Sequence, residues 1–566
     1  MKRISRHIIR DTFPFRSIVL LLFIWCSVLS ASAQLSGFFP PPPKDTVRKK
    51  KIEIIKTDSL LFRTEDLGRY RKLIGHVQVR HEDARMYCDS AIIDIDANYM
   101  TAYGKMIHVQ KGDSIDLWGD YLEYFGDQKL ALLKGNCVLK DKSMILTTPE
   151  LTYNLDTDIG SYSNSGRLVN KGTTINSRAG YYYHRTGNAV FYHDVVLYDS
   201  SRTIYADSLR YNIDNEIAYF ITKTTIIDKD SNIIVTNSGY YDTRREKAVL
   251  GNNATIKRGD ATVKAATIDY DNKAKEAIAK GNVVFHDSSE RTTILSNYVF
   301  SQEKNDFIKA YNDPLLISVS EDEKDTMYLS ADTLLSYKIA VTDTIFYRDS
   351  IQPDSIISYD IMEDSVKIVQ AYYKMKMIQG NMSAIADSLY YSDIDSAFKL
   401  YKNPVLWMDS TQITGDSIFL WMKDKEIHRA DVMGNAFIIH MQHETVFDQI
   451  KGKTMLALIA QKKIQEVQVD GNAESIYFIK DKDEYNGANK STSGFITVSF
   501  NNGEVNRIKL TGAPEAEFTP MEKIDLASFK LDGFVWHWGK KPMSKYDVIR
   551  DKAQYEKYVV ENELEK

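Results

Sequence analysis

The stretch from Tyr205 to Asp214 reads YADSLRYNID, and close copies recur as IADSLYYSDID from Ile385 and as TGDSIFLWMKD from Thr414. On its own, this combination of carboxylates, a serine hydroxyl and aromatic rings resembles part of a catalytic site. An active site is seldom written several times in one chain, whereas a structural position recurs in every unit of a repeat protein. The recurrence therefore indicates that the Asp-Ser pair has an architectural role.

The stretch is one copy of a repeated motif that reads small-Asp-Ser-apolar-x-apolar. Weaker copies centre on Pro149, Ala179, Ser238, Ala266, Ser296, Lys453 and Ser493, and the steps between copies from Asp89 to Ser296 are 28 to 31 residues. The better copies are Cys88-Asp89-Ser90, Gly119-Asp120-Tyr121, Ala206-Asp207-Ser208, Ala331-Asp332-Thr333, Ala386-Asp387-Ser388 and Gly415-Asp416-Ser417.

A second motif, Gly-Asn followed in most copies by an apolar run, lies about half a unit away. It occurs at Gly135-Asn136, Gly251-Asn252, Gly281-Asn282, Gly380-Asn381, Gly434-Asn435 and Gly471-Asn472, and it becomes Asn with proline in Asn312-Asp313-Pro314 and Asn403-Pro404. Between the motifs, apolar residues alternate with polar ones, as in Leu209, Tyr211 and Ile213. A period of two predicts strands, so each unit contains about two strands and two turns.

A fixed period in a strand-rich chain predicts stacked units, because one unit cannot bury its apolar face alone. The composition agrees, since the 566 residues include 35 Tyr and only 12 Pro and are 43% hydrophobic. We therefore predict an all-β fold, a repetitive antiparallel stack with a short C-terminal helix. Ser544 followed by Asp547 is typical of a capping box at the start of that helix.

The N-terminus is typical of a cleaved signal peptide. Five basic residues precede or flank the short apolar run Ser17–Ser30, and Ala31-Ser32-Ala33 forms a small-residue cleavage site. The run is shorter than the roughly 20 residues that a membrane span needs. Cleavage after Ala33 would remove five bases and one acid, changing the net charge from -5 to -9. We expect an exported protein in the periplasm, possible association with the outer membrane, and no nucleic-acid partner.

The predicted organisation follows from the breaks in the repeat. The segments are a signal peptide (1–33), a linker (34–55), a first stack of repeats (56–339), an insertion or joint (340–367), a second stack (368–530) and a C-terminal tail with a helix (531–566). The acidic segment Ala340–Val366 lengthens the motif step from Asp332 to Asp387 to 55 residues.

The sequence offers little catalytic or metal-binding chemistry. His440 and His443, the closest histidine pair, would lie on opposite faces of a strand, and no Gly-x-Ser-x-Gly elbow is present. The 77 acidic residues are spread evenly, so no carboxylate pair stands out. We expect no enzyme, no cofactor and no metal. Cys88 and Cys137, the cysteines left in the mature chain, occupy different places in the repeat and are expected to be buried free thiols.

The two motifs together resemble those of the OstA-like, LptA-type family of periplasmic lipopolysaccharide transport proteins. The resemblance is carried by Ala279-Lys280-Gly281-Asn282-Val283 and by the pattern from Ala206 to Tyr211, and it runs from about Gly75 to Phe518. It implies a β-jellyroll (β-taco) stack with an open hydrophobic groove that holds the acyl chains of lipid A. It also implies partners among other lipopolysaccharide-transport proteins at the inner and outer membranes, joined end to end by strand addition.

The function expected from this resemblance is that of a periplasmic bridge carrying lipopolysaccharide to the outer membrane. Two alternatives remain at the level of sequence: a structural or adhesive closed β-solenoid without lipid cargo, and a polysaccharide-degrading enzyme. The candidate groove residues are the apolar positions of the alternating strands: Ile93, Ile95, Leu122, Tyr124, Leu209, Tyr211, Ile213, Ile268, Tyr270, Tyr298, Phe300, Leu389, Tyr391, Ile418 and Leu420. A register error of one residue would turn any of them outward.

Overall fold

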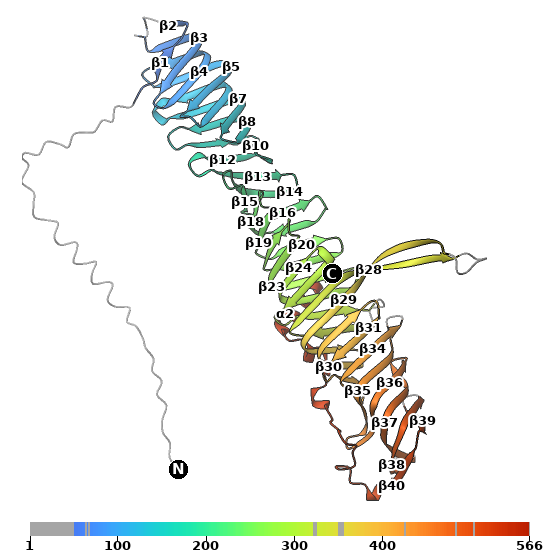
Figure 1. The fold of residues 1–566 in the computed structure, drawn as a ribbon. Coiled ribbons are helices and arrows are strands. Elements are labelled where there is room, and N and C mark those ends of the chain that lie inside the picture. Colours follow the sequence, from blue (N-terminus) through green and yellow to red (C-terminus); the bar gives the residue numbers. More distant parts are fainter. Residues whose placement is uncertain are drawn as a thin grey trace, which may run out of the picture. The chain divides into compact units, whose positions relative to one another are not determined.

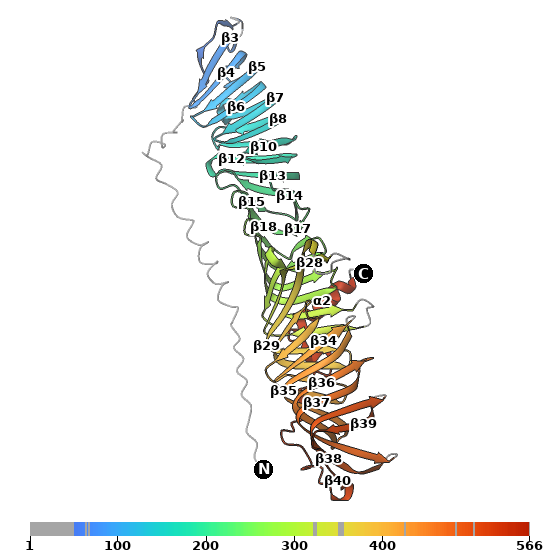
Figure 2. The same ribbon diagram turned by 45° about the vertical axis from the view of Figure 1, so that its right-hand side comes forward.

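The structure is a computed structural model, and it describes residues 50–564 apart from 63–64, 66–67, 321–324, 349–355, 424–425, 482–483 and 502–503. The predicted signal peptide and most of the predicted linker therefore lie outside the described residues. Lys51–Lys566 form one compact unit. Its strands follow one another in chain order along a single stack (Figures 1 and 2), and each strand pair in the described part is antiparallel. The all-β antiparallel prediction is thus confirmed.

The first part of the stack is a meander of long strands preceded by two short ones. Its strands are β1 (Glu53–Lys56), β2 (Ser59–Phe62), β3 (Tyr70–His81), β4 (Ala84–Asp94), β5 (Tyr99–Lys111), β6 (Ile115–Phe125), β7 (Leu130–Asp141) and β8 (Met144–Asn154).

In the middle part, many long strands are replaced by two shorter ones. The strands are β9 (Ile159–Tyr162), β10 (Gly166–Asn170), β11 (Thr173–Ser177), β12 (Ala179–Tyr183), β13 (Asn188–Tyr198), β14 (Arg202–Asn212), β15 (Ile217–Phe220), β16 (Thr224–Asp228), β17 (Ile233–Thr236), β18 (Ser238–Asp242), β19 (Lys247–Gly251), β20 (Ala254–Arg258), β21 (Ala261–Ala265), β22 (Thr267–Asp271), β23 (Glu276–Asp287), β24 (Thr292–Gln302), β25 (Phe307–Tyr311), β26 (Leu315–Val319) and β27 (Thr326–Ser330).

The last part begins with a long hairpin and ends with two short helices. Its elements are β28 (Thr333–Arg348), β29 (Ile356–Gln379), β30 (Met382–Ser392), β31 (Ala397–Tyr401), β32 (Val405–Met408), β33 (Thr411–Thr414), β34 (Ser417–Lys423), β35 (Glu426–His443), β36 (Val446–Ala460), β37 (Lys463–Asp481), β38 (Glu484–Asn501), β39 (Glu504–Thr511), β40 (Glu515–Pro520), α1 (Lys545–Val548) and α2 (Lys552–Leu564).

The strand pairing builds two walls that meet at a corner. The first wall includes β10, β11, β16, β17, β20 and β21, and the second includes β9, β12, β15, β18, β19 and β22. Long strands such as β14 and β23 cross the corner and belong to both walls. At the edge away from the corner, which we call the rim, hairpin turns connect the strands of each wall.

The two sequence motifs meet at the corner. Gly135 and Asn136 have φ angles of 75° and 45°, and the register of β7 shifts between Lys134 and Cys137. Gly and Asn tolerate this left-handed conformation better than other residues do. The Asn136 side-chain amide donates to the carboxylate of Asp120 at 2.8 Å, and a Cβ on Gly135 would lie 2.6 Å from the same carboxylate. The Asp of one motif therefore faces the Gly-Asn of the next strand.

The same corner recurs along the stack with some variation. Asn435 donates to Asp416 at 3.0 Å in the same way. Before Pro314 and Pro404 the left-handed pairs are Asn312-Asp313 and Lys402-Asn403. Gly380-Asn381 differs, because it forms the hairpin turn between β29 and β30 at the rim.

Apolar side chains fill the space between the walls. On β14, Ile204, Leu209 and Tyr211 face inward and are fully buried, whereas Tyr205 faces outward and is 46% exposed. The inward positions change from even to odd residue numbers at the corner, because the bulge alters the alternation there. One continuous apolar cluster runs through the stack from Ile52 to Val498.

Residues 340–367 do not separate two stacks. β28 and β29 pair with each other from Thr333 to Arg348, while the next strands, β25 and β30, pair only with the ends of the hairpin nearest the stack. The far part of the hairpin extends beyond the neighbouring strands (Figure 1). Of the two predicted alternatives, an insertion or a joint, the segment is therefore an insertion, a projecting hairpin, and the described sheet is continuous on both sides of it. β1, at Glu53–Lys56, begins within the segment that was expected to be linker.

The chain after β40 runs back along the outer side of the first wall. We call residues 521–564 the strap. Its first part packs against Phe437, Phe447 and Phe478. Its helix α2 packs against Leu295 and Leu315, far earlier in the chain. The helix predicted after Ser544 is present, and the carboxylate of Asp547 accepts the Ser544 backbone N–H at 2.8 Å, as in a capping box. No described helix is long and apolar enough to cross a membrane.

Candidate functional site

Most of the predicted groove residues face the interior between the walls. Three of them, Ile95, Tyr270 and Tyr391, are partly buried against the apolar cluster. Ten are buried members of that cluster: Ile93, Leu122, Tyr124, Leu209, Tyr211, Ile213, Ile268, Leu389, Ile418 and Leu420.

Tyr298 and Phe300 do not face the interior, because the motif was placed one residue too early in β24. Ser296 is itself the small corner residue, fully buried, with its hydroxyl donating to the backbone oxygen of Tyr311 at 2.7 Å. Asn297 then takes the Asp position and accepts the Asn282 backbone N–H at 3.3 Å. The inward positions that follow are Val299 and Ser301, and Tyr298 stacks on Tyr311 on the outer face.

Hydrogen bonds across the rims close the interior in the first part of the stack. The Tyr124 hydroxyl on the second wall lies 2.6 Å from Nδ1 of His81 on the first. Two periods later, Tyr182 donates to the carboxylate of Asp141. We call this contact and its equivalents the tyrosine ladder.

Two further steps complete the tyrosine ladder. The Asn170 amide donates to the Tyr211 hydroxyl at 3.3 Å, and the Tyr241 hydroxyl donates to Asp199 at 3.2 Å. Burial raises the pKa of Tyr241 above its usual range, so the phenol remains a neutral donor.

The tyrosine ladder was largely missed from sequence, although a signal was available. Tyr153, Tyr182 and Tyr241 were not singled out, whereas Tyr124, Tyr211 and Tyr270 were. All six tyrosines are spaced by 29 or 30 residues, which is the period of the repeat. Periodicity identifies all six as inward positions but cannot reveal which hydroxyls reach the opposite rim. Those of Tyr124, Tyr182, Tyr211 and Tyr241 do, whereas the buried Tyr153 hydroxyl has no hydrogen-bond partner among the described residues.

The ladder ends at Tyr270. By the spacing of the earlier steps, its partner would be Asp228 on the first wall. The Tyr270 hydroxyl instead contacts Asn272 at 3.3 Å and Glu303 at 3.4 Å, both on its own wall. Burial, followed by the charge of Glu303, raises the pKa of Tyr270 to about 12. From this point the walls are no longer joined by the ladder.

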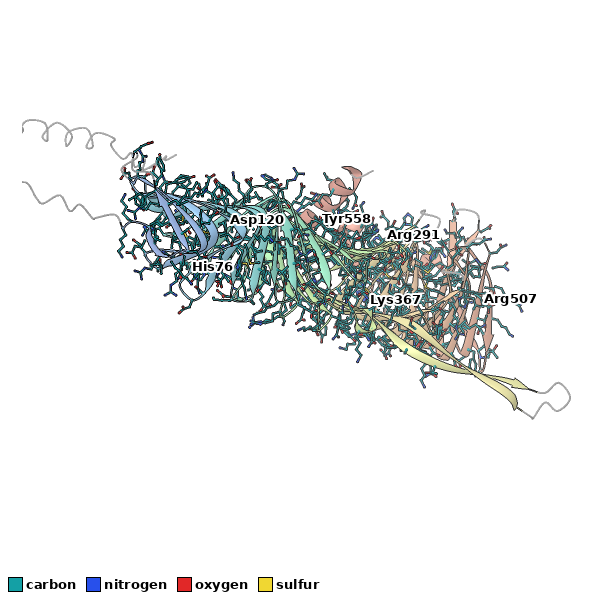
Figure 3. The ribbon with its side chains drawn as sticks, turned by 90° about the horizontal axis from the view of Figure 1, so that it is seen from above. His76, Asp120, Arg291, Lys367, Arg507 and Tyr558 are labelled. Atoms are coloured by element: carbon teal, nitrogen blue, oxygen red, sulfur yellow. The ribbon has the colours of Figure 1, made fainter. Side chains whose placement is uncertain are left out.

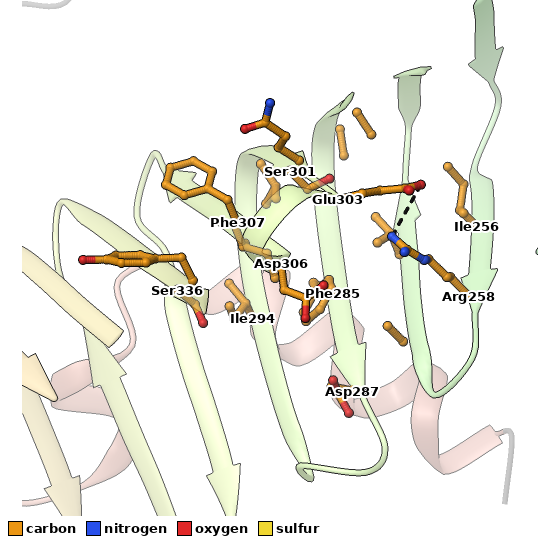
Figure 4. A pocket seen from close by; sticks show the side chains of 18 of the residues that line it. Ile256, Arg258, Phe285, Asp287, Ile294, Ser301, Glu303, Asp306, Phe307 and Ser336 are labelled. Carbon is orange, nitrogen blue, oxygen red and sulfur yellow. Dashed lines mark ion pairs between the residues drawn. The ribbon is translucent and has the colours of Figure 1, made fainter. Parts of the chain in front are cut away.

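A cavity opens between the walls where the ladder ends (Figure 4). Its inner surface is apolar and its outer surface carries charged side chains. Several interior positions, including Ile256, Phe285 and Ile308, are only partly buried here, which shows that the interior reaches the surface. The apolar lining includes Ile256, Val263, Ala277, Phe285, Ile294 and Ile308.

Ion pairs cross the mouth of this cavity. Arg258 at the rim of the first wall lies 3.4 Å from Glu303 on the second (dashed line in Figure 4). Lys367 of β29 pairs with Glu290, in the turn before β24, and Figure 3 marks the place of Lys367 in the stack. Burial lowers the pKa of Lys367. The mouth is therefore held by individual side-chain ion pairs and not by the continuous backbone pairing of a sheet.

The structure shows buried free thiols at Cys88 and Cys137, as expected. Burial raises the pKa of the Cys88 thiol to about 12 and that of Cys137 to about 11, so neither is a reactive thiolate. Within the described ranges, no three His, Cys, Asp or Glu side chains gather in a way that could hold a metal ion.

The arrangement defines a class of protein: a stack of antiparallel strands in two walls with an apolar interior that opens to the surface. Two family models match in sequence. One is described as OstA-like protein and matches residues 49–201 and 193–266, and the other as LptA/(LptD N-terminal domain) LPS transport protein and matches residues 262–426. The chain belongs to the OstA-like, LptA-type family of lipopolysaccharide transport proteins.

Comparison with individual proteins gives less information about this chain than the family models do. No curated protein matches the chain significantly. Among solved structures, the chain is similar to LptH of Pseudomonas aeruginosa, the LptA-homologous periplasmic component of its lipopolysaccharide transport device. The identity is 18%, the match covers 20% of this chain and 82% of that one, and the TM-score is 0.18. The fold assignment consequently rests on the strand pairing of this chain.

Proposed function

We propose that this chain is a periplasmic bridge protein that binds lipopolysaccharide in its interior and passes it toward the outer membrane. The observation that carries the proposal is the apolar interior, which is continuous along the stack and opens to the surface at the cavity. Acyl chains would lie in this interior, because burying them there removes apolar surface from water. Family membership supports lipopolysaccharide as the class of cargo.

The two faces of β23 provide the test. Ala277 lines the cavity, whereas its neighbour Ile278 pairs with Phe300 on the opposite face. A charge at Ala277 would sit among the acyl chains, so Ala277→Asp should weaken binding of lipid A to the purified protein about tenfold or more. Ile278→Asp, on the outside of the same strand, is the matched control and should bind normally. Equal binding by both variants, with both folded, would contradict the proposal.

A closed structural stack without cargo is the second candidate, and one observation favours it. Between β3 and β18 the interior side chains are almost fully buried, and the tyrosine ladder joins the rims. In that case the cavity would be a local imperfection of packing. This candidate predicts that purified protein carries no lipid and that Ala277→Asp has no binding phenotype.

The partners proposed for this function would add strands at the ends of the stack. Among the described strands, β2 pairs only with β3, and its Leu60, Leu61 and Phe62 are 42%, 55% and 58% exposed. An apolar, unpaired strand edge is a template for another chain. Chemical cross-linking of cells should therefore give assemblies larger than the single chain, and Leu61→Asp should remove them. An unchanged cross-linking pattern would exclude this end as an interface.

Export into the periplasm is part of the same proposal and rests on the signal-peptide pattern ending at Ala33. Fractionation of cells should recover a mature protein that begins at Gln34 in the periplasmic or outer-membrane fraction. Recovery of the uncleaved chain in the cytoplasm would contradict it.

A further inference from the structure

A buried arginine lies where the tyrosine ladder gives way to the cavity. Arg202 begins β14 and is only 4% exposed. Its position is on the inner side of the first wall, two residues before the buried core residue Ile204. The strand next to it is β16, where Asp228, the register partner of Arg202, lines the cavity.

The guanidinium of Arg202 is incompletely satisfied. Nε donates to the Ser201 hydroxyl at 3.3 Å, and the guanidinium carbon lies 4.3 Å from the centre of the Tyr241 ring. Nη1 and Nη2, however, are buried and have no hydrogen-bond partner among the described residues. A buried cation without acceptors is costly, so its presence calls for an explanation.

No hydrogen bond joins Nη1 or Nη2 to the nearby acids, whose carboxylates accept bonds from other groups. Asp199 accepts the backbone N–H of Ser201 at 2.7 Å and the Tyr241 hydroxyl. Asp228 accepts the backbone N–H of Asn232 at 2.9 Å and its side-chain amide at 2.9 Å. Arg202 thus retains a planar pair of N–H groups suited to a bidentate anion such as a phosphate.

The cavity provides a complement to that anion site. Asp228, the register partner of Arg202 on the neighbouring strand, lines the cavity together with Tyr270, so Arg202 lies one strand away from the cavity wall. Apolar side chains continue from there to Phe285 and Ile308. An anion site therefore adjoins an apolar chamber that is open to the surface.

We propose that Arg202 binds the phosphate of a phosphorylated acyl-chain amphiphile whose chains occupy the cavity beside it. The mouth between the tyrosine ladder and the Lys367–Glu290 pair is then where such a molecule enters or leaves the stack sideways. This inference rests on the proposed function and adds to it the place where the phosphate head group of the lipid binds.

The test compares two arginines on the same strand. Arg210 faces outward from β14 and lies 4.2 Å over the ring of Tyr219, so it repeats the cation–π contact of Arg202 on the opposite face. Arg202→Gln and Arg210→Gln would be titrated with diphosphoryl lipid A and with the same lipid after enzymatic removal of both phosphates. The wild-type protein should prefer the phosphorylated lipid about tenfold, the value expected for a lost charge-assisted contact.

Arg202→Gln should abolish this preference, and Arg210→Gln should retain it. Arg202→Lys, which keeps the charge but not the bidentate geometry, should retain part of it. The melting temperature of Arg202→Gln should stay unchanged or rise, because an unsatisfied buried charge is removed. A loss of binding to both lipids alike, with a lowered melting temperature, would assign Arg202 a structural role and overturn the inference.

Inorganic phosphate distinguishes a lipid head group from a free anion. At millimolar concentration it should not displace diphosphoryl lipid A, since the chains supply most of the affinity. Full displacement would indicate a site for free phosphate and would overturn the head-group assignment. If the wild-type protein bound neither lipid, the proposed function itself would be wrong. If it bound both lipids equally, the proposed function would stand and only the role of Arg202 in binding phosphate would be wrong.

Discussion

At the scale of single residues, the corner explains why the chain repeats the same two short sequence motifs. Asp120 and Asn136 are joined by a hydrogen bond at one corner, and Asp416 and Asn435 at another. These polar residues lie at the surface and fix a backbone that turns sharply from one wall to the other. The Asp-Ser stretch that could be mistaken for a catalytic site is therefore a structural joint.

Gly135→Ala should destabilise the protein by about 1–3 kcal/mol. Alanine disfavours the positive φ of this position, and its Cβ would clash with the Asp120 carboxylate. Gly112→Ala is the matched control. Gly112 has a φ of 56°, but nothing lies within 4 Å of its added Cβ, so only the backbone cost of about 1 kcal/mol should appear. Urea denaturation of the two variants measures the difference. Equal losses would show that the contact with Asp120 does not matter.

Asp448 on β36 should make stability depend on pH. Burial raises its pKa to about 6, although it accepts the Phe478 backbone N–H at 2.9 Å. Because the folded pKa lies above the unfolded one, the contribution to stability is complete below about pH 4. It is lost as the pH rises to about 6, by about 3 kcal/mol.

Asp448→Asn cannot ionise and should remove that part of the pH dependence. Urea midpoints at pH 5 and pH 7.5 provide the measurement, and the gap between them should narrow in the variant. An identical gap in the wild type and the variant would show that Asp448 is not the titrating group.

At the scale of elements, the strap is held to the first wall by buried glutamine side chains. Gln412 donates to the backbone oxygen of Val535 at 2.8 Å and accepts the His537 N–H at 2.7 Å. Gln554 on α2 donates to the backbone oxygens of Val283 and Ser296, at 3.1 and 2.9 Å. An irregular segment needs such partners, because its backbone groups have no strand to pair with.

Gln412→Leu should release the strap locally, since it leaves the groups at Val535 and His537 unpaired at a cost of about 1–3 kcal/mol each. Hydrogen exchange of residues 531–540 should become faster, while exchange in β14 stays slow. Gln465→Leu is the control, because Gln465 is exposed and bonds only to its own turn. Unchanged exchange in the strap would mean that apolar packing alone holds it.

The strands, their period and the final helix could be predicted from sequence, because alternation and capping are local signals. The strap could not, since its contacts join Gln554 to Val283 across 271 residues. Residues 340–367 could be predicted only as an insertion or a joint, because an acidic segment gives no sign of which strands it extends. At the site, the prediction places Tyr298 and Phe300 one residue out of register, because it puts Ser296 in the Asp position, which Asn297 occupies.

At the scale of the whole molecule, the described part of the stack is closed in one region and open in another. The tyrosine ladder joins the rims from Tyr124 to Tyr241, and the cavity follows from Asp228 to Val369. Passage of acyl chains through the ladder region would require the ladder hydrogen bonds to open transiently. An acyl chain that enters at the cavity would need only the ion pairs across the mouth to separate. Whether lipid is found within the ladder region therefore decides how much of the interior binds cargo.

The most direct measurement is photocrosslinking in cells at Tyr211 and Arg210. Tyr211 faces the interior and is itself part of the tyrosine ladder, and Arg210 faces outward on the same strand. If the interior carries lipopolysaccharide along the stack, a photoreactive residue at 211 should form lipopolysaccharide adducts and one at 210 should not. Adducts at neither position, in folded protein, would contradict transport through this part of the interior and favour the closed structural stack.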